Sequence, residues 1–143
     1  MKTTKLVVEY DYDFEIVSII SSLKPYYLAL QINKQLGTKL HYEDDITLNF
    51  VRNGKLTLLN FIHKTEYQCY RLIKNKAVEY ENIDKPYLIP ELKEYDFILH
   101  IHTEGSKPDC ESIVQALKQI QGIELVRYIQ NKEQLKSKDN LIF

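Results

Sequence analysis

The pattern that most constrains the fold is a strand, a short helix and a second strand near the C-terminus. Residues 96–102 alternate with a period of two, and residues 123–129 are again rich in β-forming side chains. A capping-box pattern, Ser106 with Asp109 three residues later, precedes the helix. Its apolar stripe comprises Ile113, Leu117 and Ile120, and Gly122 ends it. This order predicts one compact, right-handed crossover unit.

A second alternating segment covers residues 6–15. Its apolar face comprises Leu6, Val8, Tyr10, Tyr12 and Phe14, and its acidic face comprises Glu9, Asp11, Asp13 and Glu15. This period predicts a half-buried strand whose acidic face is in solvent or against a partner. Residues 16–20 are β-branched and fit either the end of this strand or a connection.

A helix is expected from Pro25 to about Leu36, because apolar residues repeat there at intervals of four and Gly37 follows. Ser21 and Ser22 are candidate N-caps. Two β-rich runs, 46–51 and 56–62, then flank an Asn-Gly dipeptide, which predicts a hairpin. Residues 67–73 continue this meander, whereas 38–45 and 78–94 are expected to be connections.

Together these elements give the order β-α-β-β-β-β-α-β. We therefore expect an α+β fold with a mainly antiparallel sheet and two helices on one face, ferredoxin-like or a related two-layer sandwich. No repeat or linker divides the chain, so residues 1–143 are interpreted as a single domain.

The composition narrows the functional class. Hydrophobic residues make up 44% and charged residues 27%, which is typical of a globular chain, and the net charge of −1 gives no reason to expect binding to nucleic acid or membrane. The N-terminus lacks a signal-peptide pattern, so we expect a soluble, cytoplasmic protein. The two cysteines, Cys69 and Cys110, have no CxxC spacing and are expected to be free thiols.

His100 and His102 are the sharpest chemical candidates. In a strand, residues two apart point to the same side, so both imidazoles have the spacing to share a metal ion. Glu91, Asp96, Glu104 or Asp109 are possible further ligands. The alternative is a pair of polar strand residues opposite an apolar face. No nucleophile or phosphate-binding motif occurs, and no cofactor is expected.

The chain ends in Leu141, Ile142 and Phe143. Three adjacent apolar side chains are costly to leave in water. We therefore expect this end to dock on the protein itself or on a partner subunit; a frayed tail is the alternative.

One segment resembles a known family. Ile89, Pro90, Glu91, Asp96 and Phe97 are similar to the motif of the IPExxxDY family of uncharacterised bacterial proteins, and residues 136–143 and the Tyr27-Leu28-Ala29 helix also resemble that family. Two departures are that four residues separate Glu91 from Asp96 and that Phe97 stands where the motif has Tyr. The resemblance implies no activity, and the motif itself indicates a loop end at Pro90 and a strand start at Asp96.

Residues 95–130 also faintly resemble the ligand-sensing domain of Lrp/AsnC-type regulators. That likeness implies a ferredoxin-like fold, association through sheets and amino-acid binding between subunits. The helix-turn-helix of such regulators has no counterpart here, so the likeness supports a fold and a homodimer more than a function.

Three functions remain open. The first is a non-catalytic, self-associating interaction or scaffold domain, a homodimer or the binder of another protein. The second is a small-molecule-sensing domain that binds a metabolite at a subunit interface. The third is a metal-assisted enzyme that uses His100 and His102.

Overall fold

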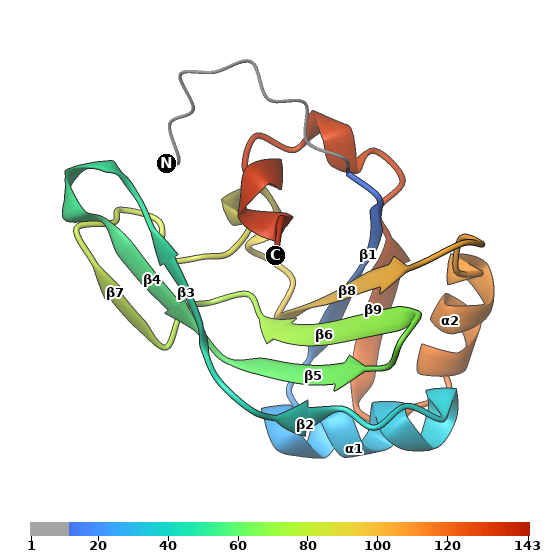
Figure 1. The fold of residues 1–143 in the computed structure, drawn as a ribbon. Helices are drawn as coiled ribbons and strands as arrows, with labels where there is room; N and C mark the ends of the chain where they lie inside the picture. The colour runs from blue at the N-terminus through green and yellow to red at the C-terminus, as the bar shows by residue number, and fades with distance from the viewer. Residues whose placement is uncertain (1–11) are drawn as a thin grey trace.

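Two antiparallel sheets organise the computed structural model, which describes residues 12–143 (Figure 1). The larger sheet has the strand order β2-β5-β6-β8-β1-β9, and the smaller has the order β3-β4-β7. The bounds are β1 Phe14–Ser21, α1 Pro25–Leu36, β2 His41–Tyr42, β3 Ile46–Asn49, β4 Lys55–Leu58, β5 Asn60–Lys64, β6 Gln68–Lys74, β7 Glu79–Glu81, β8 Phe97–Thr103, α2 Cys110–Leu117 and β9 Ile123–Tyr128. Four short 3₁₀ helices are η1 Val51–Asn53, η2 Pro90–Leu92, η3 Lys132–Gln134 and η4 Lys138–Leu141.

The predicted strand-helix-strand unit forms one side of the larger sheet, with β9 at its edge. Strands β8 and β9 both pair antiparallel with β1, so they run parallel to each other with β1 inserted between them and α2 connecting them. Strands β1, β6, β8 and β9 with α1 and α2 therefore follow the chain order β-α-β-β-α-β. The expected α+β fold with a mainly antiparallel sheet is confirmed.

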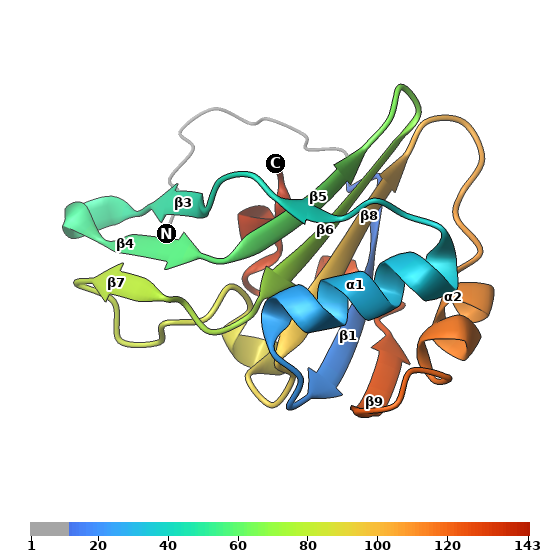
Figure 2. The ribbon, with the colours of Figure 1, turned by 90° about the horizontal axis from the view of Figure 1, so that it is seen from below.

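Both helices cover one face of this sheet, as expected. Figure 2 shows α1 lying along the sheet, with α2 beside its C-terminal end. Their buried residues pack against the strand residues that point to that face. This first core contains Leu28, Ala29, Ile32, Ile113 and Leu117 from the helices, and Val17, Ile19, Leu72, Phe97, Leu99, Ile101 and Val126 from the strands. It also contains Ile120, which lies in the turn after α2, because the helix ends at Leu117 and not at Gly122 as predicted.

The opposite face of the sheet is also covered, by a second core that the sequence did not predict. Phe14, Ile16, Ile73 and Ile98 point to this face and pack against a second core from the smaller sheet, the segment around Leu88 and the C-terminal segment. The interior strand β1 is apolar on both faces, and the cost of leaving Phe14 and Ile16 in water explains why this face is covered.

The predicted acidic face of the first strand is wrong at Glu15. Residues 6–11 lie outside the described part of the chain, and β1 begins only at Phe14, so residues 16–20 are strand. Asp13 precedes the strand and is exposed, but Glu15 is buried on the helix-covered face. Its carboxylate accepts a hydrogen bond from the Tyr128 hydroxyl and pairs with Lys132, and these partners make its burial possible.

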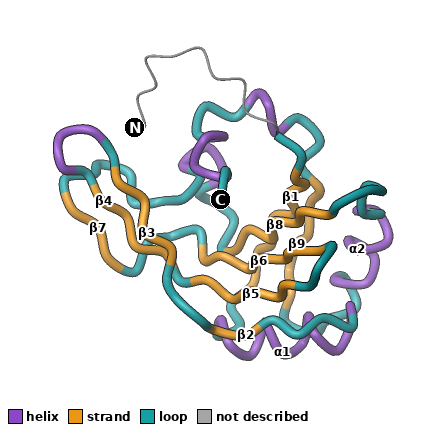
Figure 3. Tube along the Cα trace, viewed as in Figure 1, coloured by secondary structure: helices purple, strands orange, loops and turns teal. Residues whose placement is uncertain are grey.

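The run predicted as one strand over residues 56–62 is divided between the two sheets. It breaks at Leu59, where β4 leaves the smaller sheet and β5 enters the larger (Figure 3). The hairpin of β3 and β4 is confirmed, although the residues with left-handed backbone are Arg52 and Asn53, both at φ 60°, and not Gly54. The connections expected at 38–45 and 78–94 contain the short strands β2 and β7.

The helix caps differ from the expected ones. Lys24 is the N-cap of α1 and makes no side-chain cap, while the Ser21 hydroxyl accepts a hydrogen bond from the Leu23 N–H just before the helix. Asp109, rather than Ser106, caps α2 by accepting from the Ser112 N–H at 3.1 Å. Gly37 ends α1 in the left-handed conformation, as expected.

Candidate binding site

Two cross-strand rows form the floor of a cavity on the face opposite the helices. Directly paired residues of antiparallel strands point to the same face, so the strand register defines these rows. The first row runs through Lys64, Cys69, His102 and Phe14 on strands β5, β6, β8 and β1. The second row contains Arg71, His100 and Ile16 on β6, β8 and β1. Sheet pairing therefore brings residues from four strands to one surface.

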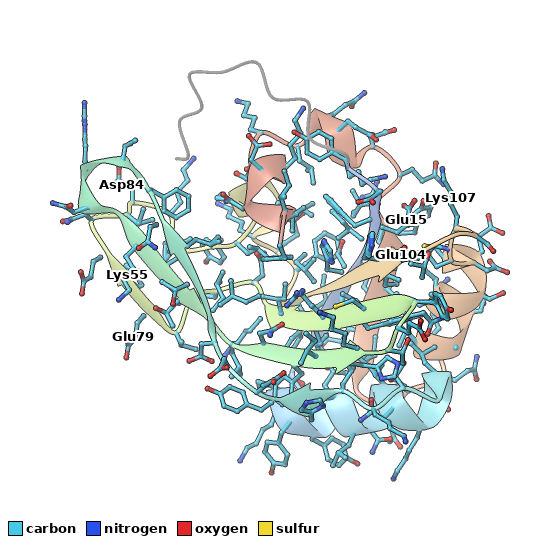
Figure 4. All side chains as sticks on the ribbon, in the orientation of Figure 1. Glu15, Lys55, Glu79, Asp84, Glu104 and Lys107 are labelled. Atoms are coloured by element: carbon cyan, nitrogen blue, oxygen red, sulfur yellow. The ribbon has the colours of Figure 1, made fainter. Side chains whose placement is uncertain are left out.

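The C-terminal segment covers this floor. Leu141 is fully buried, Ile142 is partly buried, and the Phe143 ring lies against His100 with the two ring centroids 5.0 Å apart. The expectation that the apolar end docks on the protein itself is thus confirmed for Leu141. Between floor and cover remains a cavity of about 320 Å³, whose outer wall includes Asp13 and Glu104. Figure 4 shows Glu104 beyond the end of β8.

His100 acts as an internal anchor for the C-terminal segment. Its ring stacks on Phe14 at 4.6 Å between centroids, and its Nε2 atom lies 2.9 Å from the Leu141 carbonyl oxygen. Because a carbonyl only accepts, Nε2 carries the proton, and the buried Nδ1 has no hydrogen-bond partner among residues 12–143. Burial lowers the pKa of His100 from 6.5 to about 3, so the imidazole is neutral at physiological pH.

His102 lies on the same face as His100 but nearer the surface. Its Nδ1 atom is 3.5 Å from an Asp13 oxygen, and its Nε2 atom is 3.9 Å from a Glu104 oxygen. Within the described chain, no group of three or more histidine, cysteine or acidic side chains is arranged to hold a metal ion. The sheet thus brings together the two predicted histidines and Glu104, while the Nε2 atom of His100 is already bonded to the backbone.

Two cations line the cavity opposite these acids. Lys64 and Arg71 come from β5 and β6, and neither side chain forms an ion pair or donates a hydrogen bond within residues 12–143. The Arg71 guanidinium carbon lies 5.1 Å from the centre of the Phe143 ring. The ring covers one face of the guanidinium and leaves its N–H edge unpaired.

The motif residues lie outside this cavity and hold segments of the chain together. The Glu91 carboxylate accepts hydrogen bonds from the N–H and the hydroxyl of Ser137, at 2.9 and 2.8 Å. The Asp96 carboxylate accepts from the Ser21 N–H at 2.8 Å. These contacts link the segment before β8 to the C-terminal segment and to the end of β1.

The remaining motif positions are also structural. Ile89 is fully buried, and its N–H donates to the side-chain oxygen of Asn75, a buried residue at the end of β6. Pro90 begins η2, and Phe97 begins β8 within the first core. Of the other metal ligands considered from sequence, Asp109 is used as the α2 cap.

A second cluster of polar side chains, around Glu15, lies on the helix-covered face of the sheet, and it contains no activated nucleophile. Glu15, labelled in Figure 4, accepts from Tyr128 at 2.6 Å and lies 3.7 Å from the Lys132 ammonium. The hydrogen bond to Glu15 raises the pKa of Tyr128. Burial, followed by the Glu15 charge, raises the pKa of the nearby Cys110 thiol to about 11. Both cysteines are free, but a thiol protonated this strongly is a poor nucleophile.

Sequence reasoning missed Lys64, Arg71 and Asp13 as members of a common site. They come from three separate segments, and only the register of β5, β6, β8 and β1 brings them together. The alternation of Lys64 and Arg71 within β-rich runs was a signal of their orientation, but it gave no partner strand.

The comparisons with known proteins add no assignment. The chain matches no protein-family model, and no curated protein is significantly similar to it. Among the described residues, no helix is long and apolar enough to cross a membrane. The fold and site therefore define a class only: an antiparallel α+β protein with a small, charged cavity beneath its C-terminal segment.

Proposed function

We propose that this chain is a non-catalytic interaction domain that forms a homodimer by pairing the β9 strands of two copies. The observation that carries the proposal is that β9 has a neighbour on one side only within the described sheet. It has six residues and contains neither proline nor lysine, the residues that commonly protect an edge. The other edge of the same sheet, β2, has only two residues.

The backbone of β9 is suited to this pairing. The Ile129 N–H donates to Ile16, so residues 125 and 127, two and four positions earlier, also direct their N–H and C=O groups toward β1. Val126 and Tyr128 then direct theirs outward, to the open edge. A second strand in antiparallel orientation would satisfy these groups.

Charge selects one register for such a dimer. A two-fold axis at Arg127 would place the two arginines opposite each other, which is unfavourable. An axis at Val126 instead places Leu125 opposite the partner's Arg127, whose aliphatic stem can cover it. Leu125 is 45% exposed in the single chain, so this register also removes apolar surface from water.

Further observations support the fold, the family and the location. The β-α-β-β-α-β order supports a ferredoxin-like fold, and the motif at Ile89 to Phe97 supports membership of the bacterial IPExxxDY family. A cytoplasmic location agrees with the free cysteines. A metal-assisted enzyme using His100 and His102 has less support, because His100 is buried and bonded to Leu141.

The test is a pair of substitutions at one exposed position. Leu125→Lys puts a cation opposite the partner's Arg127 and should convert the dimer to a monomer, whereas Leu125→Glu offers that arginine an opposite charge and should keep the dimer. Sedimentation velocity of the full chain at micromolar concentration measures the result. A monomeric parent protein, or a Leu125→Lys variant that remains fully dimeric, contradicts the proposal.

A further inference from the structure

We propose that the cavity beneath the C-terminal segment binds a small organic anion, whose oxyanion head group is held by Arg71 and Lys64. This site is independent of the proposed dimer, because its residues come from β5, β6, β8, the start of β1 and the C-terminal segment of one chain. Its volume of about 320 Å³ is that of a small-molecule site rather than a macromolecular groove.

Arg71 is the central observation. The residue is half-buried and lines the cavity, and within residues 12–143 its guanidinium donates to neither a carboxylate nor a carbonyl, while its nitrogen atoms are not among the buried unpaired ones. Its N–H groups are therefore accessible from the cavity and free to bind a ligand that enters it. Its planar fork is suited to the paired oxygens of a carboxylate or phosphate.

The Phe143 ring keeps this fork available. With the ring 5.1 Å from the guanidinium carbon, one face of Arg71 is covered and its orientation is restricted. Lys64 lies on the neighbouring strand β5, two residues beyond Ile62, which is the residue paired with Arg71. It adds a second cation at the rim of the cavity. Two cations without acidic partners create a positive end of the cavity.

The acidic residues of the cavity do not neutralise that end. A carboxylate oxygen of Asp13 lies 3.5 Å from His102 Nδ1, and a carboxylate oxygen of Glu104 lies 3.9 Å from His102 Nε2. Neither carboxylate forms an ion pair with Arg71 or Lys64. Charge is therefore separated across the cavity, with cations on β5 and β6 and acids beside β8 and β1. An anion is favoured at the first end and repelled from the second.

The apolar residues that cover the cavity determine what the rest of the ligand should be. Phe14, Leu141, Ile142 and Phe143 supply apolar lining between the charged ends. A ligand that matches both parts has an oxyanion head and a short apolar or aromatic body. Carboxylates and phosphate esters share this chemistry, and the experiment separates them.

The experiment is an amide chemical-shift titration of the full chain at low ionic strength with benzoate, phenyl phosphate and neutral benzamide. Saturable shifts with benzoate or phenyl phosphate, centred on Cys69, Arg71 and the last three residues, support the site, and the tighter ligand identifies the head group. Benzamide, which has the shape of benzoate without its charge, should not saturate. Equal binding of benzamide, or no saturable shift with either anion, overturns the proposal.

Two variants and a control test whether Arg71 and Lys64 bind the oxyanion head group. Arg71→Gln should weaken the tighter anion roughly tenfold or more, the loss expected for a charge-assisted hydrogen bond. Lys64→Gln, at the exposed rim, leaves the interior intact and should weaken it by a smaller factor. Lys118→Gln, after α2, changes the same charge far from the cavity and should have no effect. Unchanged affinity in both cavity variants overturns the assignment.

Discussion

A single buried imidazole, that of His100, connects the sheet to the C-terminal segment. It donates to Leu141, contacts two aromatic rings and keeps one nitrogen atom without a partner in the described chain. Protonation would place a cation in this apolar setting beside Arg71, and both burial and that charge oppose it. His100 should therefore make the stability of the protein depend on pH.

The direction of this pH dependence follows from comparing the pKa of His100 in the folded and the unfolded chain. Between pH 6.5, the ordinary pKa, and about pH 3, the unfolded chain binds a proton at His100 that the folded chain does not. Stability from this group is complete above the ordinary pKa and is lost as pH falls. From about pH 6.5 to about pH 4.5, the free energy of unfolding should fall by about 2–3 kcal/mol on this account.

Urea unfolding of the parent protein and of His100→Gln measures this contribution, because the variant lacks the titrating group. The fall in stability across that pH range should be smaller in His100→Gln than in the parent. His41→Gln, at an exposed position, is the control and should retain the parent's pH dependence. Identical pH profiles for the parent and His100→Gln would show that His100 does not titrate as its burial indicates.

At the residue scale, the sequence predicted the sheet face to which a side chain points, but not how far that side chain is buried. The alternation of residues 96–102 placed His100 and His102 on one face, as the register confirms. It did not reveal that His100 is buried and His102 is not, because Leu141 and Phe143 cover only one of them, and they are some forty residues distant in the chain. Glu15 was misplaced for the same reason, since its partners Tyr128 and Lys132 are remote.

At the scale of elements, the C-terminal segment is the part that completes the fold. Leu141 is fully buried in the second core, and Asn140 donates to the Leu88 carbonyl at 2.9 Å. Glu91 holds Ser137 from the other side. The segment thus covers the sheet with both an apolar anchor and specific hydrogen bonds.

Leu141→Ala should therefore lower the free energy of unfolding by about 2–5 kcal/mol, because the substitution leaves a cavity in a closed core. The matched control is Leu30→Ala in α1, where the side chain is 51% exposed and the expected change is within about 0.5 kcal/mol. Chemical denaturation of both variants provides the comparison. Equal midpoints for Leu141→Ala and the parent would mean that the terminal segment does not contribute to the folded state.

Elements specified by local signals were predicted well, and those specified by distant contacts were not. The helices α1 and α2 have their own apolar stripes, α1 has its glycine stop at Gly37, and the hairpin of β3 and β4 has its own turn residues, although α2 ends at Leu117, before the predicted stop at Gly122. The break at Leu59 has no such signal, because the runs before and after it are equally β-rich. The two runs are divided only by their partners, because β4 pairs with β7 in the smaller sheet and β5 pairs with β6 in the larger sheet.

For the whole molecule, one sheet serves two cores. Val17 and Leu99 face the helices, while Ile16 and Ile98, their neighbours in β1 and β8, face the second core. The loss of either core exposes one side of the same central strands. The two cores are therefore expected to unfold together, although the smaller sheet shares no strand with the larger.

Substitutions in the two cores test this coupling. Leu28 in α1 and Leu58 in β4 are both fully buried, one in each core, and Leu28→Ala and Leu58→Ala should each cost about 2–5 kcal/mol of stability. In each variant, unfolding followed by far-UV circular dichroism and by tyrosine fluorescence should give one shared transition. A Leu58→Ala variant with an early transition confined to part of the signal would mean that the second core melts alone. Such an outcome would divide residues 12–143 into two folding units, because the larger sheet and its helices would then persist without the smaller sheet and the C-terminal segment.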